Sequence, residues 1–223
     1  MLIDPPLASP AYQSTGLRAP RRPPVTINPG RTELAGPSIS LREGCNPTVE
    51  CDLTTEGPVG ERIIVTGRVV DSDGGPVRNS LVEIWQANAA GRYRHDSDQH
   101  DAPLDPGFDG AGRCLTDHDG SYRFVTIKPG AYPWGNHDNA WRPAHLHFSL
   151  YGASFGSRLI TQMYFPGDPL LVLDPIYQSV PDPRGRARLV AAFDIDATVP
   201  NTALGYRWDI VLRGPAATPW EQS

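Results

Sequence analysis

Short runs of β-branched and aromatic residues alternate with turn-forming residues along most of the chain. The run at 63–70 leads into a glycine- and proline-containing turn at 71–76, and the run at 81–86 places alternate residues on two faces. Further strands are expected at 122–127, 145–150, 159–165, 187–195 and 206–213. No internal repeat is visible. We therefore expect an all-β chain, an antiparallel β-sandwich of short strands with long loops and little helix.

The first 59 residues lack this pattern and are dense in proline, glycine and polar residues. Their prolines exclude a long helix, so a second folded domain is not expected there. The composition alone favours a tail, and an extended arm along another protein surface is the alternative. We predict an N-terminal segment at 1–59 and a single folded domain at 60–223.

Composition narrows the class of protein. The chain has 223 residues with 39% hydrophobic and 20% charged positions, which suits one globular domain with its own core. A net charge of −5 without a basic cluster argues against nucleic acid as a partner. No segment reaches the roughly 20 apolar residues of a membrane helix, and the first residues lack a signal-peptide core. The three cysteines, Cys45, Cys51 and Cys114, form no CxxC pair, so free thiols in the cytoplasm are expected.

The most informative stretch is 132–147, which reads YPWGNHDNAWRPAHLH. Its last residues begin a predicted strand, so His145 and His147 share one face while Leu146 faces the core. Two adjacent imidazoles suit a metal ion, although such a pair is by itself more often an ordinary surface or core pair. Tyr132 and Trp134, in a loop rich in glycine and proline, and the cation Arg142 complete what resembles one wall of a pocket.

The nature of the metal depends on the remaining ligands. Zinc sites with a His pair of this kind usually add cysteine or a carboxylate. A cupin-type site needs a glutamate a few residues beyond the second His, and the only glutamate after His147 is Glu221, near the end of the chain. A tyrosine phenolate is the nearby candidate, and a hard anionic oxygen favours ferric iron.

Five segments together resemble one family, the intradiol ring-cleaving dioxygenases, over roughly 60–213. The segments are GERIIV at 60–65, EIWQANAAGRY at 83–93, GAGRC at 110–114, YPW at 132–134 and WRPAHLH at 141–147. The resemblance implies a non-haem Fe(III) site with Tyr93, Tyr132, His145 and His147 as ligands. Two phenolates, two neutral imidazoles and a hydroxide bring a trivalent ion close to neutrality, and no flavin or nicotinamide is required. Without the resemblance, Tyr93 is an ordinary packing residue in a polar loop.

The resemblance also implies roles around the metal. Tyr132 would accept a proton from the substrate, Arg142 would stabilise negative charge on its ring, and Gln162 would hydrogen-bond near O2 or hydroxide. Apolar walls would come from Trp85, Trp134 and Ile176. The ordinary readings are a surface ion pair for Arg142, a polar strand residue for Gln162 and core packing for the apolar three. The remaining histidines are expected to be solvated and without roles: His95, His100, His118 and His137.

The resemblance implies cleavage of protocatechuate with O2 to 3-carboxy-cis,cis-muconate, a step of aromatic catabolism in the β-ketoadipate pathway. The iron-bearing beta-type chain would pair with an alpha-type chain of the same fold, with the N-terminal segment as an arm at subunit contacts. Catechol or hydroxyquinol is the alternative substrate, although those relatives carry a helical N-terminal region that the proline-rich start does not resemble. Two other hypotheses remain, a β-sandwich carrier without chemistry and a zinc hydrolase built on the His pair.

Overall fold

The computed structural model describes residues 5, 6, 8, 13, 14, 16, 22, 50–98, 100–136, 138, 141–151 and 158–220. Most of the predicted N-terminal segment 1–59 lies outside these residues, and so do Cys45 and His137. None of the described helices is long and apolar enough to cross a membrane.

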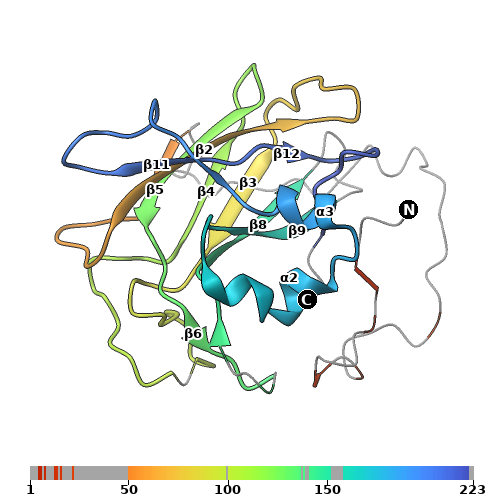
Figure 1. The fold of residues 1–223 in the computed structure, drawn as a ribbon. Coiled ribbons are helices and arrows are strands. Elements are labelled where there is room, and N and C mark those ends of the chain that lie inside the picture. Colours follow the sequence, from red (N-terminus) through yellow and green to blue (C-terminus); the bar gives the residue numbers. More distant parts are fainter. Residues whose placement is uncertain are drawn as a thin grey trace.

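Two β-sheets form the body of the molecule (Figure 1). The larger sheet contains, in spatial order, β1 (Glu50–Asp52), β5 (Ser121–Ile127), β2 (Arg62–Val70), β11 (Leu204–Arg207) and β10 (Ala192–Phe193), and β12 (Ile210–Val211) also pairs with β2. The smaller sheet runs in the order β4 (Ala111–Leu115), β3 (Leu81–Trp85), β8 (His145–Tyr151) and β9 (Arg158–Tyr164). A separate two-stranded ribbon consists of β6 (Tyr132–Pro133) and β7 (Trp141–Arg142).

The core lies between the two sheets. Val65 and Phe124 of the larger sheet and Ile84, Leu146 and Phe148 of the smaller belong to one cluster and are at most 1% exposed. Alternate residues of each strand point inward, so one face of each sheet supplies the core. Each such side chain contributes about 1.5–3 kcal/mol through burial. The predicted all-β sandwich with little helix is confirmed.

Several strand pairs join segments that are distant in sequence. The pairs β2 with β5, β3 with β4 and β8, β8 with β9, and β10 with β11 are antiparallel. Strand β1 adds to β5, and β11 and β12 add to β2, in parallel. No tight hairpin connects these parallel partners, so the sequence pattern alone did not predict their direction. Strand β1 also shows that part of the segment predicted as an arm belongs to the larger sheet.

Three short helical segments follow β9, and each begins at the proline of an Asp-Pro pair. They are the 3-10 helix η2 (Pro169–Val172) and the α-helices α2 (Pro175–Ser179) and α3 (Pro183–Arg188). The aspartates 168, 174 and 182 accept N–H groups of the first turn, and proline fits the first helical position. The expected strand at 187–195 is therefore partly wrong, because its first two residues complete α3.

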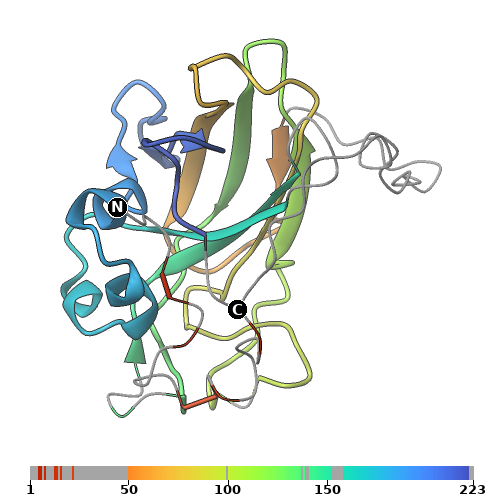
Figure 2. The same cartoon turned by 90° about the vertical axis from the view of Figure 1, so that its right-hand side faces the viewer.

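The expected strand at 206–213 is interrupted between β11 and β12. The Oδ1 atom of Asp209 accepts the backbone N–H of Arg68 at 2.9 Å, in place of a backbone carbonyl of the neighbouring strand. Figures 1 and 2 show the β3–β4 loop, β6 and α2 gathered at the lower end of the molecule. The candidate site lies at this end.

Candidate metal centre and active site

Strand β8 carries core residues on one face and histidines on the other. Leu146 is fully buried in the core, as predicted, and the neighbouring His145 and His147 point to the outer face of the smaller sheet. Across the sheet, His147 pairs with Trp85 of β3 and Gln162 of β9. The Trp85 indole stacks on the His147 ring with 4.8 Å between centroids and 5° between planes. The sheet therefore fixes both imidazoles on rigid strands.

Tyr93 lies in the loop after β3 and Tyr132 begins β6, and the segments that lead to these two residues pack tightly on each other. The N–H of Gly130 donates to the carbonyl of Asn88 at 3.0 Å. Gly91 has φ +78°, and a Cβ at this position would lie 2.3 Å from the carbonyl oxygen of Ala131. Only glycine allows both the left-handed backbone and this approach. The glycine of the segment 83–93 thus places Tyr93 beside the segment that carries Tyr132.

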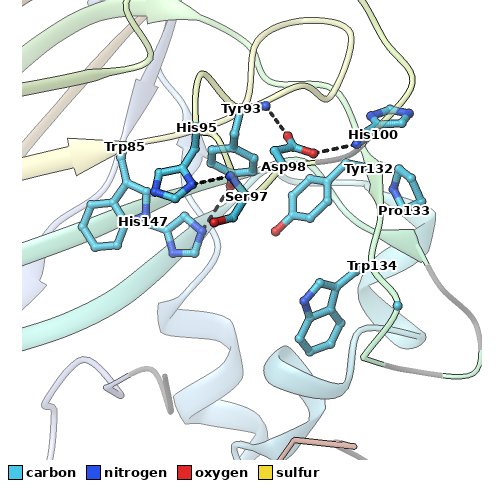
Figure 3. Close-up of a pocket in the computed structure, with 11 residues that line it drawn as sticks. Trp85, Tyr93, His95, Ser97, Asp98, His100, Tyr132, Pro133, Trp134 and His147 are labelled. Atoms are coloured by element: carbon cyan, nitrogen blue, oxygen red, sulfur yellow. Dashed lines mark hydrogen bonds between the residues drawn. The ribbon is translucent and has the colours of Figure 1, made fainter.

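The four predicted ligands converge in space. The Nε2 atom of His147 lies 3.2 Å from the Oη of Tyr93 and 3.2 Å from the Nε2 of His145, which lies 3.3 Å from the Oη of Tyr132. Donor atoms bound to one metal at about 2.0–2.1 Å lie roughly 2.9–3.4 Å apart. The spacing therefore fits a single shared ion. Figure 3 shows the Tyr132 phenol and the His147 ring facing the same space.

The protonation of the donors suits a cation. The Nδ1 of His145 lies 2.7 Å from the carbonyl oxygen of Pro143, which can only accept, so Nδ1 carries the proton and Nε2 the lone pair. Burial, reinforced by the charge of Arg142, holds the pKa of His145 well below its ordinary value, so the ring is neutral. Burial raises the pKa of Tyr132, and Arg142 offsets this only partly. Ionising that phenol requires a strong positive charge beside it, as a metal ion provides.

The type of ligand limits the type of metal. Among the described residues, no group of three or more His, Cys, Asp and Glu side chains could hold a metal ion. In that part of the chain, a zinc site with a third ligand of these kinds is therefore not formed. The phenol oxygens of Tyr93 and Tyr132 are the further donor atoms at this point, and oxygen donors of this kind would favour a hard, highly charged ion.

Arg142 is a buried cation beside these donors. Its side chain is 2% exposed, and Nη2 donates to Asp174 at 2.9 Å, Gln162 at 2.6 Å and Tyr164 at 3.2 Å. The Nη1 atom lies 3.4 Å from the Oη of Tyr132. Burial alone would lower the pKa of Arg142, but the negative charge of Asp174 outweighs it, and the pKa lies well above its ordinary value. The reading of Arg142 as a surface ion pair is therefore wrong.

An open cavity of about 680 Å³ adjoins the donors. Of the predicted apolar wall, Trp85 and Trp134 line it, together with Tyr93, Tyr132 and His147 (Figure 3). The guanidinium carbon of Arg142 lies 5.3 Å from the centre of the Trp134 ring. The expected third member, Ile176, is half-buried in the first turn of α2 and is not among the described residues that line the cavity.

Four polar residues of the β3–β4 loop also line the cavity, namely His95, Ser97, Asp98 and His100. The two histidines were expected to be solvated, and the structure places His95 exposed and His100 half-buried at the wall. Asp98 accepts the N–H of Tyr93 at 2.6 Å and so fixes the backbone at that residue. The unusual length of this polar loop was the available signal for a functional role. His118, in contrast, is exposed on the surface as expected.

Comparisons with known proteins identify the family of the chain. A family model described as Dioxygenase matches residues 35–214. The chain is 58% identical over 218 residues to the protocatechuate 3,4-dioxygenase beta chain of Burkholderia cepacia, covering 96% of this chain and 92% of that protein. It is 30% identical over 198 residues to the protocatechuate 3,4-dioxygenase alpha chain of Pseudomonas putida, covering 84% and 92%.

A solved structure shares the fold. Catechol 1,2-dioxygenase from Acinetobacter sp. ADP1, inhibited by bound mercury, matches with a TM-score of 0.58 and 26% identity. The match covers 77% of this chain and 60% of that one, so the present chain spans less than two thirds of that enzyme. From the family model and the full-length similarity, the chain belongs to the intradiol ring-cleavage dioxygenase family.

Proposed function

We propose that this chain is the metal-bearing subunit of an intradiol dioxygenase that cleaves protocatechuate with O2 to 3-carboxy-cis,cis-muconate in aromatic catabolism. The convergence of two phenol oxygens and two imidazole nitrogens at one point carries this proposal. The choice of protocatechuate is supported by 58% identity to the beta chain from Burkholderia cepacia, against 26% to the catechol 1,2-dioxygenase structure.

Intradiol dioxygenases are in general iron-dependent. Tyr93, Tyr132, His145 and His147 would hold ferric iron, because two phenolates and two neutral imidazoles offset much of the charge of a trivalent ion. When bound, ferric iron would supply the Lewis acidity that makes a catechol ring reactive towards O2. The neutral state of His145 and the need of Tyr132 for a neighbouring cation both support this choice.

Tyr132 would accept a proton from the substrate, and Arg142 would stabilise negative charge on it. Tyr132, held as a phenolate, can take the proton of one substrate hydroxyl at its Oη atom. Arg142 keeps its positive charge in a buried position and directs Nη1 towards the metal side of the site, where it can stabilise negative charge on the ring. A fixed charge in a site shielded from water acts more strongly than one exposed to solvent.

Gln162 and the aromatic walls would position the reactants. The Oε1 atom of Gln162 already accepts bonds from Arg142 and from Tyr164 at 2.7 Å, so a bond to O2 or hydroxide would come from its NH2 group. Trp85 and Trp134 offer flat apolar surface to a single aromatic ring.

A partner of the alpha type, with the same fold, would complete the assembly, as the similarity to the alpha chain of Pseudomonas putida suggests. The N-terminal segment 1–59 of this chain would act as an arm at the contact with that partner. The N–H groups of Gln13 and Ser14 donate to Asn136 at 3.1 and 3.0 Å, next to the loop of Tyr132 and Trp134. A cytoplasmic location is supported by the thiols of Cys51 and Cys114, which form no disulfide. Burial raises the pKa of the Cys114 thiol to about 12, so this thiol stays protonated at neutral pH.

Co-expression of this chain with its alpha-type partner tests the proposal. The purified complex should contain iron, show the red-brown colour of phenolate-to-iron charge transfer, and consume O2 with protocatechuate faster than with catechol. A colourless, iron-free complex without O2 uptake would favour a carrier. Bound zinc without O2 uptake would favour a hydrolase, and faster uptake with catechol would change the substrate.

A further inference from the structure

We infer that Asp174 is a positioning residue that orients Arg142 towards the metal donors. The inference rests on the proposed function, in which Arg142 stabilises negative charge on the substrate ring. It concerns a residue outside the ligand set and outside the lining of the cavity. Asp174 therefore acts through Arg142.

The two carboxylate oxygens of Asp174 have separate tasks. The Oδ1 atom accepts the N–H of Ile176 at 2.9 Å and caps α2. The Oδ2 atom accepts a hydrogen bond from Nη2 of Arg142 at 2.9 Å. The side chain of Asp174 is fully buried. The helix cap thus holds the carboxylate in place, and the carboxylate holds the guanidinium.

The hydrogen bonds of Arg142 are distributed unevenly over its planar group. Nη2 makes the bonds to Asp174, Gln162 and Tyr164, while Nη1 lies 3.3 Å from the Nε2 of His145 and close to Tyr132. The Nε atom is buried, and no described residue accepts a bond from it. The rotation of the rigid guanidinium therefore depends on the acceptors at Nη2.

Among these acceptors, only Asp174 carries a charge. Gln162 and Tyr164 are neutral and cannot compensate a buried cation. Removing one partner of a buried ion pair leaves an uncompensated charge. Without Asp174, the Arg142 guanidinium would therefore turn towards other acceptors or towards water. Asp174 is therefore the contact whose loss changes the orientation of Arg142 most.

The chain contains a matched control in a second Asp-Pro cap. Asp182 begins α3, and its Oδ1 accepts the N–H of Arg184 at 2.9 Å while its Oδ2 accepts a bond from the guanidinium of the same residue at 3.0 Å. The Arg184 side chain is 77% exposed and lies outside the cavity lining. The same substitution at Asp182 removes a capping charge and an arginine partner without touching the site.

Asp174→Asn and Asp182→Asn are compared in the iron-loaded complex with the alpha-type partner. Asparagine offers one oxygen, which the cap uses, so its NH2 group would face Nη2 of Arg142. We expect kcat with protocatechuate to fall about 100-fold for Asp174→Asn, the size of effect that a small misplacement causes, with little change in KM or iron content. The visible absorption band should shift, because Nη1 lies beside Tyr132. For Asp182→Asn, kcat should stay within about twofold of the value for the unsubstituted complex, because this substitution does not affect the position of Arg142.

A double-mutant cycle separates positioning from a general structural effect. In an Arg142→Gln background, Asp174→Asn should cause no further loss of kcat, because coupled residues are not additive. Independent losses that multiply, or an unchanged kcat and spectrum for Asp174→Asn, would overturn the inference. If Asp174→Asn does not fold, Asp174→Glu keeps the charge but moves the carboxylate, and a wild-type kcat in that variant would overturn it equally.

The two proposals fail in different ways. An unsubstituted complex that consumes no O2 contradicts the proposed function, and the absorption band of the iron-loaded variants then still reports whether Asp174 orients Arg142. An active complex in which Asp174→Asn is also fully active contradicts the positioning role alone.

Discussion

Replacing Tyr132 by phenylalanine removes a single oxygen atom and leaves the ring contacts in place. The ring meets Tyr93 edge-on at a centroid distance of 5.3 Å and His145 at 5.4 Å. The lost oxygen lies 3.3 Å from His145 and 3.4 Å from Arg142. The hydroxyl also shares a hydrogen bond with the side chain of Tyr93. Because the apolar ring contacts remain and polar contacts alone disappear, we expect the free energy of unfolding to fall by about 0.5–1.5 kcal/mol.

The effect on turnover should be much larger than the effect on stability. A positioned proton acceptor contributes about 10²- to 10⁴-fold to a rate. At 1.36 kcal/mol per factor of ten, Tyr132→Phe should raise the barrier by about 2.7–5.4 kcal/mol. One of two phenolates is also lost, so the charge-transfer band should change in position and intensity.

The assay combines O2 uptake with protocatechuate, the visible spectrum and chemical denaturation of the same preparation. Tyr151→Phe is the matched control, because Tyr151 lies at the far end of β8 with the Arg158 guanidinium 5.4 Å from its ring centre. The control should keep the rate and the spectrum. Unchanged turnover and an unchanged spectrum in Tyr132→Phe would refute its assignment as ligand and proton acceptor.

Three further predictions concern β8. His147→Ala removes one of the four donors and should abolish stoichiometric iron binding, measured by elemental analysis, and full iron retention would contradict the ligand set. Leu146→Ala, on the opposite face, should keep the iron site. Because the Leu146 side chain is fully buried, the free energy of unfolding, measured by urea denaturation, should fall by about 2–5 kcal/mol. In the metal-free protein, His145 stays neutral when folded but takes up a proton when unfolded, so stability should fall as the pH drops below the ordinary pKa of 6.5, by up to about 1.4 kcal/mol per pH unit. Thermal unfolding across this range measures the slope, and a flat profile would show that His145 is not buried as a neutral ring.

The local pattern of β8 predicted much of the site. Strand periodicity placed His145 and His147 on one face and Leu146 in the core, and the structure has this arrangement. The position of Tyr93 came only from the family resemblance, because no local spacing relates it to His147, 54 residues further along the chain. Contacts between distant loops depend on tertiary packing, which a periodic pattern does not encode.

The start of α3 could have been predicted from the local sequence, whereas the contact between Arg142 and Asp174 could not. The Asp-Pro pair that begins α3 is an ordinary helix start, and attention to it would have corrected the strand expected at 187–195. The bond between Arg142 and Asp174 joins residues 32 positions apart. A capping aspartate at 174 gives no sign of a second partner, so this contact required the three-dimensional structure.

Strand β8 contributes consecutive residues to the packed interior and to the proposed metal site, and this makes its alignment unusually strict. A shift by one residue would bring Leu146 into the proposed site and carry both imidazoles into the hydrophobic interior. Such a slipped arrangement would lose the chemistry and the core together, so selection for either property also preserves the other. Variation that alters catalysis while sparing the fold is therefore expected in the surrounding loops before it is expected in this strand.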